Sequence, residues 1–204
     1  MKTRNWVAAF AALAAIAVAV IVVGLGDDDD TASASGNAAD AAFITDMTAH
    51  HQGAIAMARA AQKRAANPEI RRLADDIVAA QKGEISVMRT IRRDMHGMGQ
   101  QGAGHMGMSN AEMGMDMDPA MLEDAEPFDR AFIDMMVAHH EGAVALANEV
   151  LKQGEQLALR EMARDIIDAQ TKEIAQMRAW RKAWYGSARS SADPMADHDM
   201  HSGG

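Results

Sequence analysis

The 204-residue sequence contains no cysteine. This absence excludes a disulfide, a thiolate metal site and any lipid anchor that needs a cysteine. A soft metal ion would therefore have to be bound by methionine, with histidine alongside. Both are plentiful, because the chain has 18 methionines and eight histidines.

Aromatic residues are also scarce, at 4% of a chain that is 49% hydrophobic. The apolar residues are mostly alanine with methionine, isoleucine, valine and leucine. This composition favours packed helices, since strands are enriched in β-branched and aromatic side chains. An excess of basic residues is missing too: the net charge is −9. Because binding to nucleic acid needs a basic face, we expect no nucleic-acid partner.

The longest uncharged run lies at the N-terminus, over residues 6–26. Lys2 and Arg4 precede it and four aspartates follow it, so the positive-inside rule places the rest of the chain outside the cytoplasm. We predict that residues 1–26 are an uncleaved signal-anchor or a signal peptide, with cleavage near residues 32–34. The protein is then either anchored to the membrane by this helix, or periplasmic or secreted.

A short block with paired histidines occurs twice. Residues 47–54 read MTAHHQGA, and residues 136–143 read MVAHHEGA, 89 positions later. The offset holds without insertions over some fifty residues, through two segments with apolar residues at spacings of three and four. The pattern indicates a duplicated pair of helices.

Each copy is predicted to fold as a helical hairpin, because Asn67-Pro68 interrupts the first copy and Gly154 the second. Two hairpins with one apolar face each bury those faces most simply against each other. The predicted fold is therefore an all-α, ferritin-like four-helix bundle. Its parts are a flexible linker (27–39), hairpin one (40–94), a Met/His-rich loop (95–125), hairpin two (126–185) and a disordered tail (186–204).

The connecting loop is rich in glycine, which does not support a stable helix, so we expect it to be mobile. Its methionines would then have little core to fill. We interpret its Met and His residues as weak copper ligands, and the alternatives are a low-complexity accident or a sink for oxidants. The candidate weak ligands are Met95, His96, Met98, His105, Met106, Met108, Met113, Met115 and Met117.

The paired histidines lie on the apolar face of their helix. Met47 is one turn before both His50 and His51. With a constant rise per residue, a hairpin folded at Asn67 sets Glu84 level with the histidines and Met88 level with Met47.

The second hairpin repeats this arrangement. It sets Glu173 close to His139 and His140, and Met177 close to Met136. Gly53 and Gly142 follow the histidines and are expected to let a neighbouring helix approach closely.

Imidazole nitrogen with thioether sulfur suits copper, and sulfur favours Cu(I) over Cu(II). Zinc more typically recruits thiolate, histidine or carboxylate, and hard ions prefer oxygen. Glu84 and Glu173 are either ligands or, as we prefer, groups that orient a histidine through its second ring nitrogen. The alternative is a structural polar cluster among methionines that only fill the core.

The two blocks, Phe-Ile…Met-x-x-His-His-x-Gly-Ala and Gln-x-x-Glu-Ile-x-x-Met, resemble the family called domain of unknown function 305. The resemblance covers roughly residues 40–185. It implies a ferritin-like bundle outside the cytoplasm and, as in some members, copper binding and copper resistance through Met and His. The ligands it implies are Met47, His50, His51, Met88, Met136, His139, His140 and Met177.

The sequence thus predicts a copper-binding protein, not an enzyme, that buffers, sequesters or transfers copper outside the cytoplasm. A copper transporter or oxidase is a candidate partner. One alternative is a di-iron oxidoreductase. Such bundles use Glu-x-x-His motifs, but the residues three positions after Glu84 and Glu173 are Val87 and Gln176 instead of histidine. Another is a structural module whose histidines sense pH.

Overall fold

The computed structural model describes residues 36–95, 105–116 and 118–187. The predicted signal-anchor (1–26) and most of the predicted tail lie outside these residues. Among the helices of the described part, none has the length and apolar character needed to cross a membrane.

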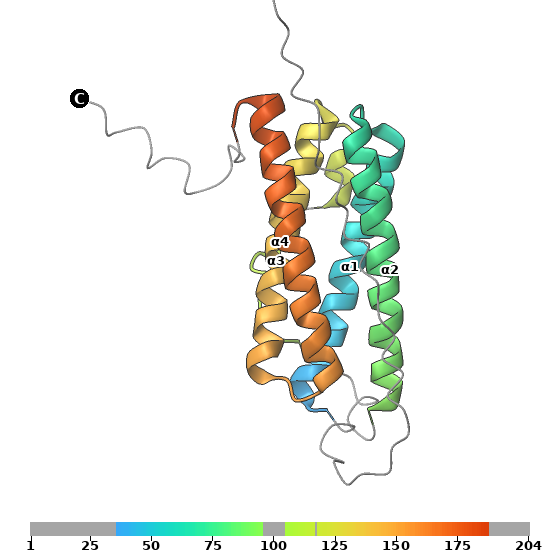
Figure 1. Ribbon diagram of the computed structural model, residues 1–204, viewed down its shortest axis with the longest axis vertical. Helices are drawn as coiled ribbons and strands as arrows, with labels where there is room; N and C mark the ends of the chain where they lie inside the picture. The colour runs from blue at the N-terminus through green and yellow to red at the C-terminus, as the bar shows by residue number, and fades with distance from the viewer. Residues whose placement is uncertain (1–35, 96–104, 117, 188–204) are drawn as a thin grey trace, which may run out of the picture.

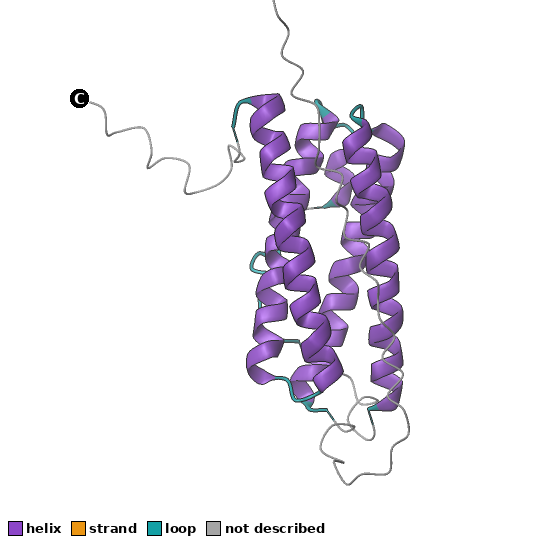
Figure 2. Ribbon diagram, viewed as in Figure 1, coloured by secondary structure: helices purple, strands orange, loops and turns teal. Residues whose placement is uncertain are grey.

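Four long helices make up the fold (Figure 1). They are α1 (Ala38–Arg64), α2 (Pro68–Asp94), α3 (Phe128–Gln153) and α4 (Leu157–Tyr185), with a short 3-10 helix η1 (Pro119–Leu122) before α3. The described ranges contain no strand (Figure 2). The predicted all-α bundle of two hairpins is confirmed for this part of the chain.

The two hairpins cap each other through one pair of equivalent aspartates. Asp40 closes a capping box with Asn37 at the start of α1, and it also accepts from the backbone N–H groups of Glu155 and Gln156. In the same way, Asp129 near the start of α3 accepts from the N–H groups that precede α2. Each hairpin turn is therefore fixed by the carboxylate that begins the other hairpin.

Replacing Asp129 with alanine is expected to lower the free energy of unfolding by about 3 kcal/mol. The change leaves the N–H groups of Ala66 and Asn67 without their acceptor, and both bonds are charge-assisted. Denaturation with urea measures the loss. Glu126→Ala is the control, since this neighbouring carboxylate is exposed and its ion pair with Arg64 contributes less than about 1 kcal/mol. An equal loss in both variants would contradict the capping role.

The hairpins pack on each other mainly through α1 and α3. The start of α1 lies at the same end of the bundle as the end of α2 and the turn between α3 and α4 (Figure 1). The connection from α2 to α3 must therefore return along the length of the bundle, as in ferritin-like crossovers.

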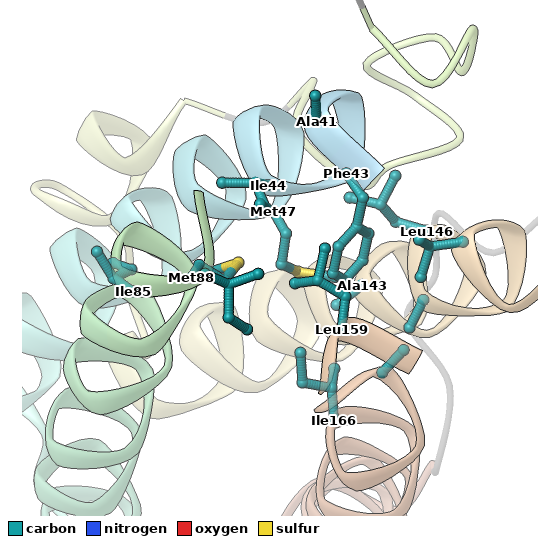
Figure 3. Packing of buried hydrophobic residues seen from close by; sticks show 14 of the residues in the cluster. Ala41, Phe43, Ile44, Met47, Ile85, Met88, Ala143, Leu146, Leu159 and Ile166 are labelled. Atoms are coloured by element: carbon teal, nitrogen blue, oxygen red, sulfur yellow. The ribbon is translucent and has the colours of Figure 1, made fainter. Parts of the chain in front are cut away.

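Two apolar clusters fill the bundle, one towards each end. The first contains Phe43, Met47 and Met88 with Leu146 and Ile166 (Figure 3). The second contains Met57 and Ile77 with Phe132, Met136 and Met177. Along each helix, the positions between the two clusters are polar. This histidine layer consists of His50, His51, Gln81, Glu84, His139, His140, Gln170 and Glu173.

The crossing connection differs from the prediction of a mobile loop. Residues 105–116, here called the strap, pack against the first cluster through Met106, Met108, Met113 and Met115. Met95 and Met113 are only 3% and 5% exposed. The prediction that the loop methionines have little core to fill is therefore wrong for those in the described residues. Glycine content argues against a helix, but it does not prevent an irregular segment from packing its methionines against the bundle.

Candidate metal centre

Helices α1 and α3 bring the four histidines to the middle of the bundle. His50, His51 and His140 are fully buried, and His139 is 4% exposed. The ring centroids of His50 and His139 lie 3.7 Å apart, and within each helix the neighbouring rings are separated by 6.2 and 6.5 Å. The histidine blocks of the two hairpins therefore meet in one layer.

Helices α2 and α4 each supply one carboxylate to this layer. Nε2 of His51 lies 2.6 Å from a carboxylate oxygen of Glu84, and Nε2 of His140 donates to Glu173 over 2.8 Å. The level calculated from the helical rise thus places each glutamate beside a histidine of its own hairpin. Because a carboxylate oxygen accepts, Nε2 of His140 carries the hydrogen and its Nδ1 carries the free electron pair. The contact of His51 with Glu84 is close but lacks hydrogen-bond geometry.

His50 is held by backbone instead of a carboxylate. Its Nε2 lies 3.0 Å from the carbonyl oxygen of Met113 in the strap and 3.0 Å from that of His139. Carbonyl oxygens only accept, so here too Nε2 is the donor and Nδ1 has the free electron pair.

The Nδ1 atoms of all four histidines are buried without a hydrogen-bond partner, as are the Oε1 atoms of Gln81 and Gln170. Nε2 of His51 and Oε2 of Glu84 touch each other but form no hydrogen bond. Leaving a buried polar atom unpaired costs about 1–3 kcal/mol, so six in one layer call for an explanation. A histidine that donates one ring nitrogen to an oxygen and presents the other is the usual arrangement at a metal ion. The donor set therefore fits a cation ligated by imidazole.

Burial also fixes the charge of the central pair. Burial, with the neighbouring His51 and His140, lowers the pKa of His50 from 6.5 to about 3. Burial likewise lowers the pKa of His139 well below 6.5, with His50 beside it. Both rings are neutral at neutral pH, which is the form that binds metal.

The predicted methionine ligands lie on both sides of the layer. Met47 and Met88 are fully buried in the first cluster (Figure 3), and Met136 and Met177 are fully buried in the second. Within the described ranges, no three His, Asp or Glu side chains are grouped so that they could hold one ion. A complete set of three ligands in the layer therefore needs methionine sulfur, or a shift of side chains on binding.

The predicted weak ligands are not gathered at the layer. His105 is anchored at the start of the strap, where its Nδ1 and the N–H of Met106 both donate to the buried carboxylate of Asp46. Met113 contacts the layer through its carbonyl group. His96, Met98 and Met117 lie outside the described residues.

Two features were not predicted from the sequence: Asp46 anchors the strap, and Gly142 lies against the strap. An aspartate four positions before His50, on a buried face, was the available signal for Asp46. A Cβ atom on Gly142 would lie 1.9 Å from the carbonyl oxygen of Met113, so this glycine admits the strap, whereas a helix was expected. Gly53 does let the neighbouring helix α3 approach, because a Cβ atom on Gly53 would lie 3.1 Å from Nε2 of His139.

Solved structures with the same fold include copper-bound proteins. CopM in the Cu(I)-bound form is 35% identical over 72% of this chain and 98% of CopM, with a TM-score of 0.62. CopM in the Cu(II)-bound form is 37% identical over 72% of this chain and 97% of CopM, with a TM-score of 0.63. A DUF305 protein of Streptomyces coelicolor, named as secreted, is 26% identical over 71% of this chain and 91% of its own, with a TM-score of 0.62.

No curated protein sequence matches the chain. The sequence profile described as "Domain of unknown function (DUF305)" matches residues 40–181, and a second match covers residues 129–203. The first match spans both hairpins and more than half of the sequence, in agreement with the resemblance of the duplicated blocks. The chain belongs to the DUF305 family.

Proposed function

We propose that the protein binds copper in its histidine layer, and that it buffers, sequesters or hands on copper outside the cytoplasm. The observation that carries the proposal is the set of four buried Nδ1 atoms without partners, between two pairs of buried methionines. CopM, a relative with the same fold, has been solved with Cu(I), Cu(II) and silver bound. Copper is the cargo in this proposal.

Cu(I) is the favoured state. Thioether sulfur is a soft ligand that selects Cu(I), and the layer keeps its histidines away from water. The imidazole nitrogens are the proposed nitrogen ligands. The proposed sulfur ligands are Met47, Met88, Met136 and Met177.

The glutamates are proposed to orient histidines. Glu84 and Glu173 each lie against an Nε2 atom, which directs the opposite ring nitrogen away from the carboxylate. A di-iron site on a ferritin-like bundle would need carboxylates from all four helices. The layer has two, and each is paired with a histidine, so this geometry favours copper over a di-iron oxidoreductase.

The strap supports weak copper capture only where its side chains reach solvent. The side chain of His105 is 75% exposed, with Nδ1 bound to Asp46, so its Nε2 is available to an ion. Met106 and Met108 follow it with partly buried side chains. Further weak ligands are proposed at Met115 and, outside the described residues, at His96, Met98 and Met117. Met95 and Met113 are buried in the first cluster and are no longer proposed.

The pH-sensing alternative is less well supported. Because burial lowers the pKa of His50 to about 3, this ring does not gain charge in the folded protein between pH 5 and 7. A switch within that range could therefore not depend on the charging of His50 in the folded protein.

An extracytoplasmic location is part of the proposal. It rests on the charges around residues 6–26 and on the relative from Streptomyces coelicolor that is named as secreted. Anchoring by residues 1–26 and delivery to a copper transporter or oxidase are proposed on the sequence and the chemistry of the cargo alone.

Replacing Glu84 and Glu173 with glutamine is expected to weaken Cu(I) binding by about 10- to 100-fold, because the carboxylates hold His51 and His140 in the ligating orientation. Competition with a chromophoric Cu(I) chelator measures the affinity. Glu161→Gln, an exposed position on α4, is the control and should bind as wild type. Unchanged affinity in the double variant would show that the glutamates do not support the ligands.

A further inference from the structure

The duplication makes most of the histidine layer symmetric. His51 pairs with Glu84 as His140 pairs with Glu173, at the same offset of 89 residues. The methionine pairs are equivalent as well, one in each apolar cluster. The symmetry fails at the remaining pair, His50 and His139.

Hydrogen bonds hold the ring of His50 in place, whereas none holds the ring of His139 within the described residues. The Nε2 atom of His50 faces two carbonyl oxygens, one of them in the strap. In the described part of the chain, neither ring nitrogen of His139 forms a hydrogen bond, and its Nδ1 is buried. His139 is also the one histidine of the layer with measurable exposure, at 4% against 0% for the other three.

The cause of this difference is the single crossing connection. The chain has one segment between its hairpins, so the strap can cover only one of two equivalent positions. Its backbone lies against Gly142, where a Cβ atom would be 1.9 Å from the carbonyl oxygen of Met113. Gly114 turns there with a φ of +63° and approaches the backbone of Ala138 and His139. At Gly53, the equivalent of Gly142, the nearest group is the ring of His139, with Nε2 3.1 Å from the position of a Cβ atom.

We propose that the two equivalent histidines have different tasks in copper exchange: the strap fixes His50 as a permanent ligand, and His139 is the exchangeable ligand through which copper is taken up and released. This assignment rests on the proposed function, because it concerns the same layer.

The physical reason is the cost of moving each ring. Moving the ring of His50 breaks the hydrogen bonds of its Nε2 to the carbonyl oxygens of Met113 and His139, and leaves this buried donor unpaired. Swinging His139 breaks no hydrogen bond. A metal ion passes between proteins by exchanging ligands one at a time, so the ring that moves most cheaply and reaches closest to solvent is the one to meet a donor or acceptor of copper.

Nuclear magnetic resonance of the copper-free protein, with histidine labelled by ¹⁵N, tests whether hydrogen bonds fix the ring of His50 more firmly than the ring of His139. The Nε2–H of His50 is expected to exchange with water at least about tenfold more slowly than the ring N–H of His139. Gly142→Ala displaces the strap and should remove this protection. The matched variant Gly53→Ala should shift the His139 signals and leave His50 protected. Equal protection of the two rings in wild type would overturn the proposal.

Stopped-flow loading from a Cu(I)–chelator complex tests the consequence. His139→Leu is expected to slow loading at least about tenfold, and by more than His50→Leu, whose main effect should be faster release of copper. Slower loading in His50→Leu than in His139→Leu, or equal slowing, would overturn the assignment while leaving copper binding intact. If wild type loads no Cu(I) at the layer, the proposed function fails, and the assignment fails with it.

Discussion

Acidifying the copper-free protein from pH 7 to pH 5 is expected to lower its free energy of unfolding by at least about 2 kcal/mol. In the unfolded chain, His50 and His139 take up protons below a pKa of about 6.5. In the folded protein, burial lowers the pKa of His50 to about 3 and that of His139 well below 6.5. Protons therefore bind the unfolded state preferentially as the pH falls from 7 to 5, which costs about 2 kcal/mol for His50, and the lowered pKa of His139 adds to this loss.

Urea denaturation across this pH range measures the effect. The double variant His50→Leu/His139→Leu is the control, because it removes both groups and should flatten the dependence. A wild-type stability that does not change between pH 7 and pH 5 would show that the two rings are not held neutral by burial.

Replacing His50, His51, His139 and His140 together with asparagine is expected to weaken Cu(I) binding by at least about 100-fold. Loss of a supporting partner alone costs 10- to 100-fold at metal sites, so loss of the imidazole ligands should cost more. Competition with a chromophoric Cu(I) chelator gives the affinity, and circular dichroism shows whether the variant folds.

One control and one further variant accompany this test. His105→Asn removes an exposed imidazole of the strap and should leave the tight site unchanged. A second quadruple variant changes Met47, Met88, Met136 and Met177 to leucine, a swap of similar volume that buried positions tolerate for less than about 1.5 kcal/mol each. It should fold and lose affinity for Cu(I) more than for Cu(II). Wild-type affinity in both quadruple variants would place the copper elsewhere.

Much of the layer could be predicted because helices carry regular geometry. The spacing of apolar residues indicated the four helices, and the constant rise placed Glu84 and Glu173 level with the histidine pair of their own hairpin. The structure shows which histidine of each pair the glutamate contacts, His51 and His140. The duplication supported the predicted position of each glutamate, because both copies have the same polar residues on the inward face of their helices.

The strap could not be predicted in this way. Its path depends on contacts between distant segments: Asp46 with the start of the strap, and Met113 with His50. No periodic pattern encodes such contacts, and the glycines that indicated mobility include Gly114, which permits the close turn against α3. The difference between His50 and His139 was hidden for the same reason, because the repeat itself predicts two equal halves.

The most direct test of copper binding in the histidine layer is X-ray absorption at the copper K-edge, on protein loaded with one equivalent of Cu(I). We predict a first shell with both imidazole nitrogen and thioether sulfur, and the loss of the imidazole signal when the four histidines of the layer are replaced. A first shell of sulfur alone, or an imidazole signal that persists in that variant, would contradict the account.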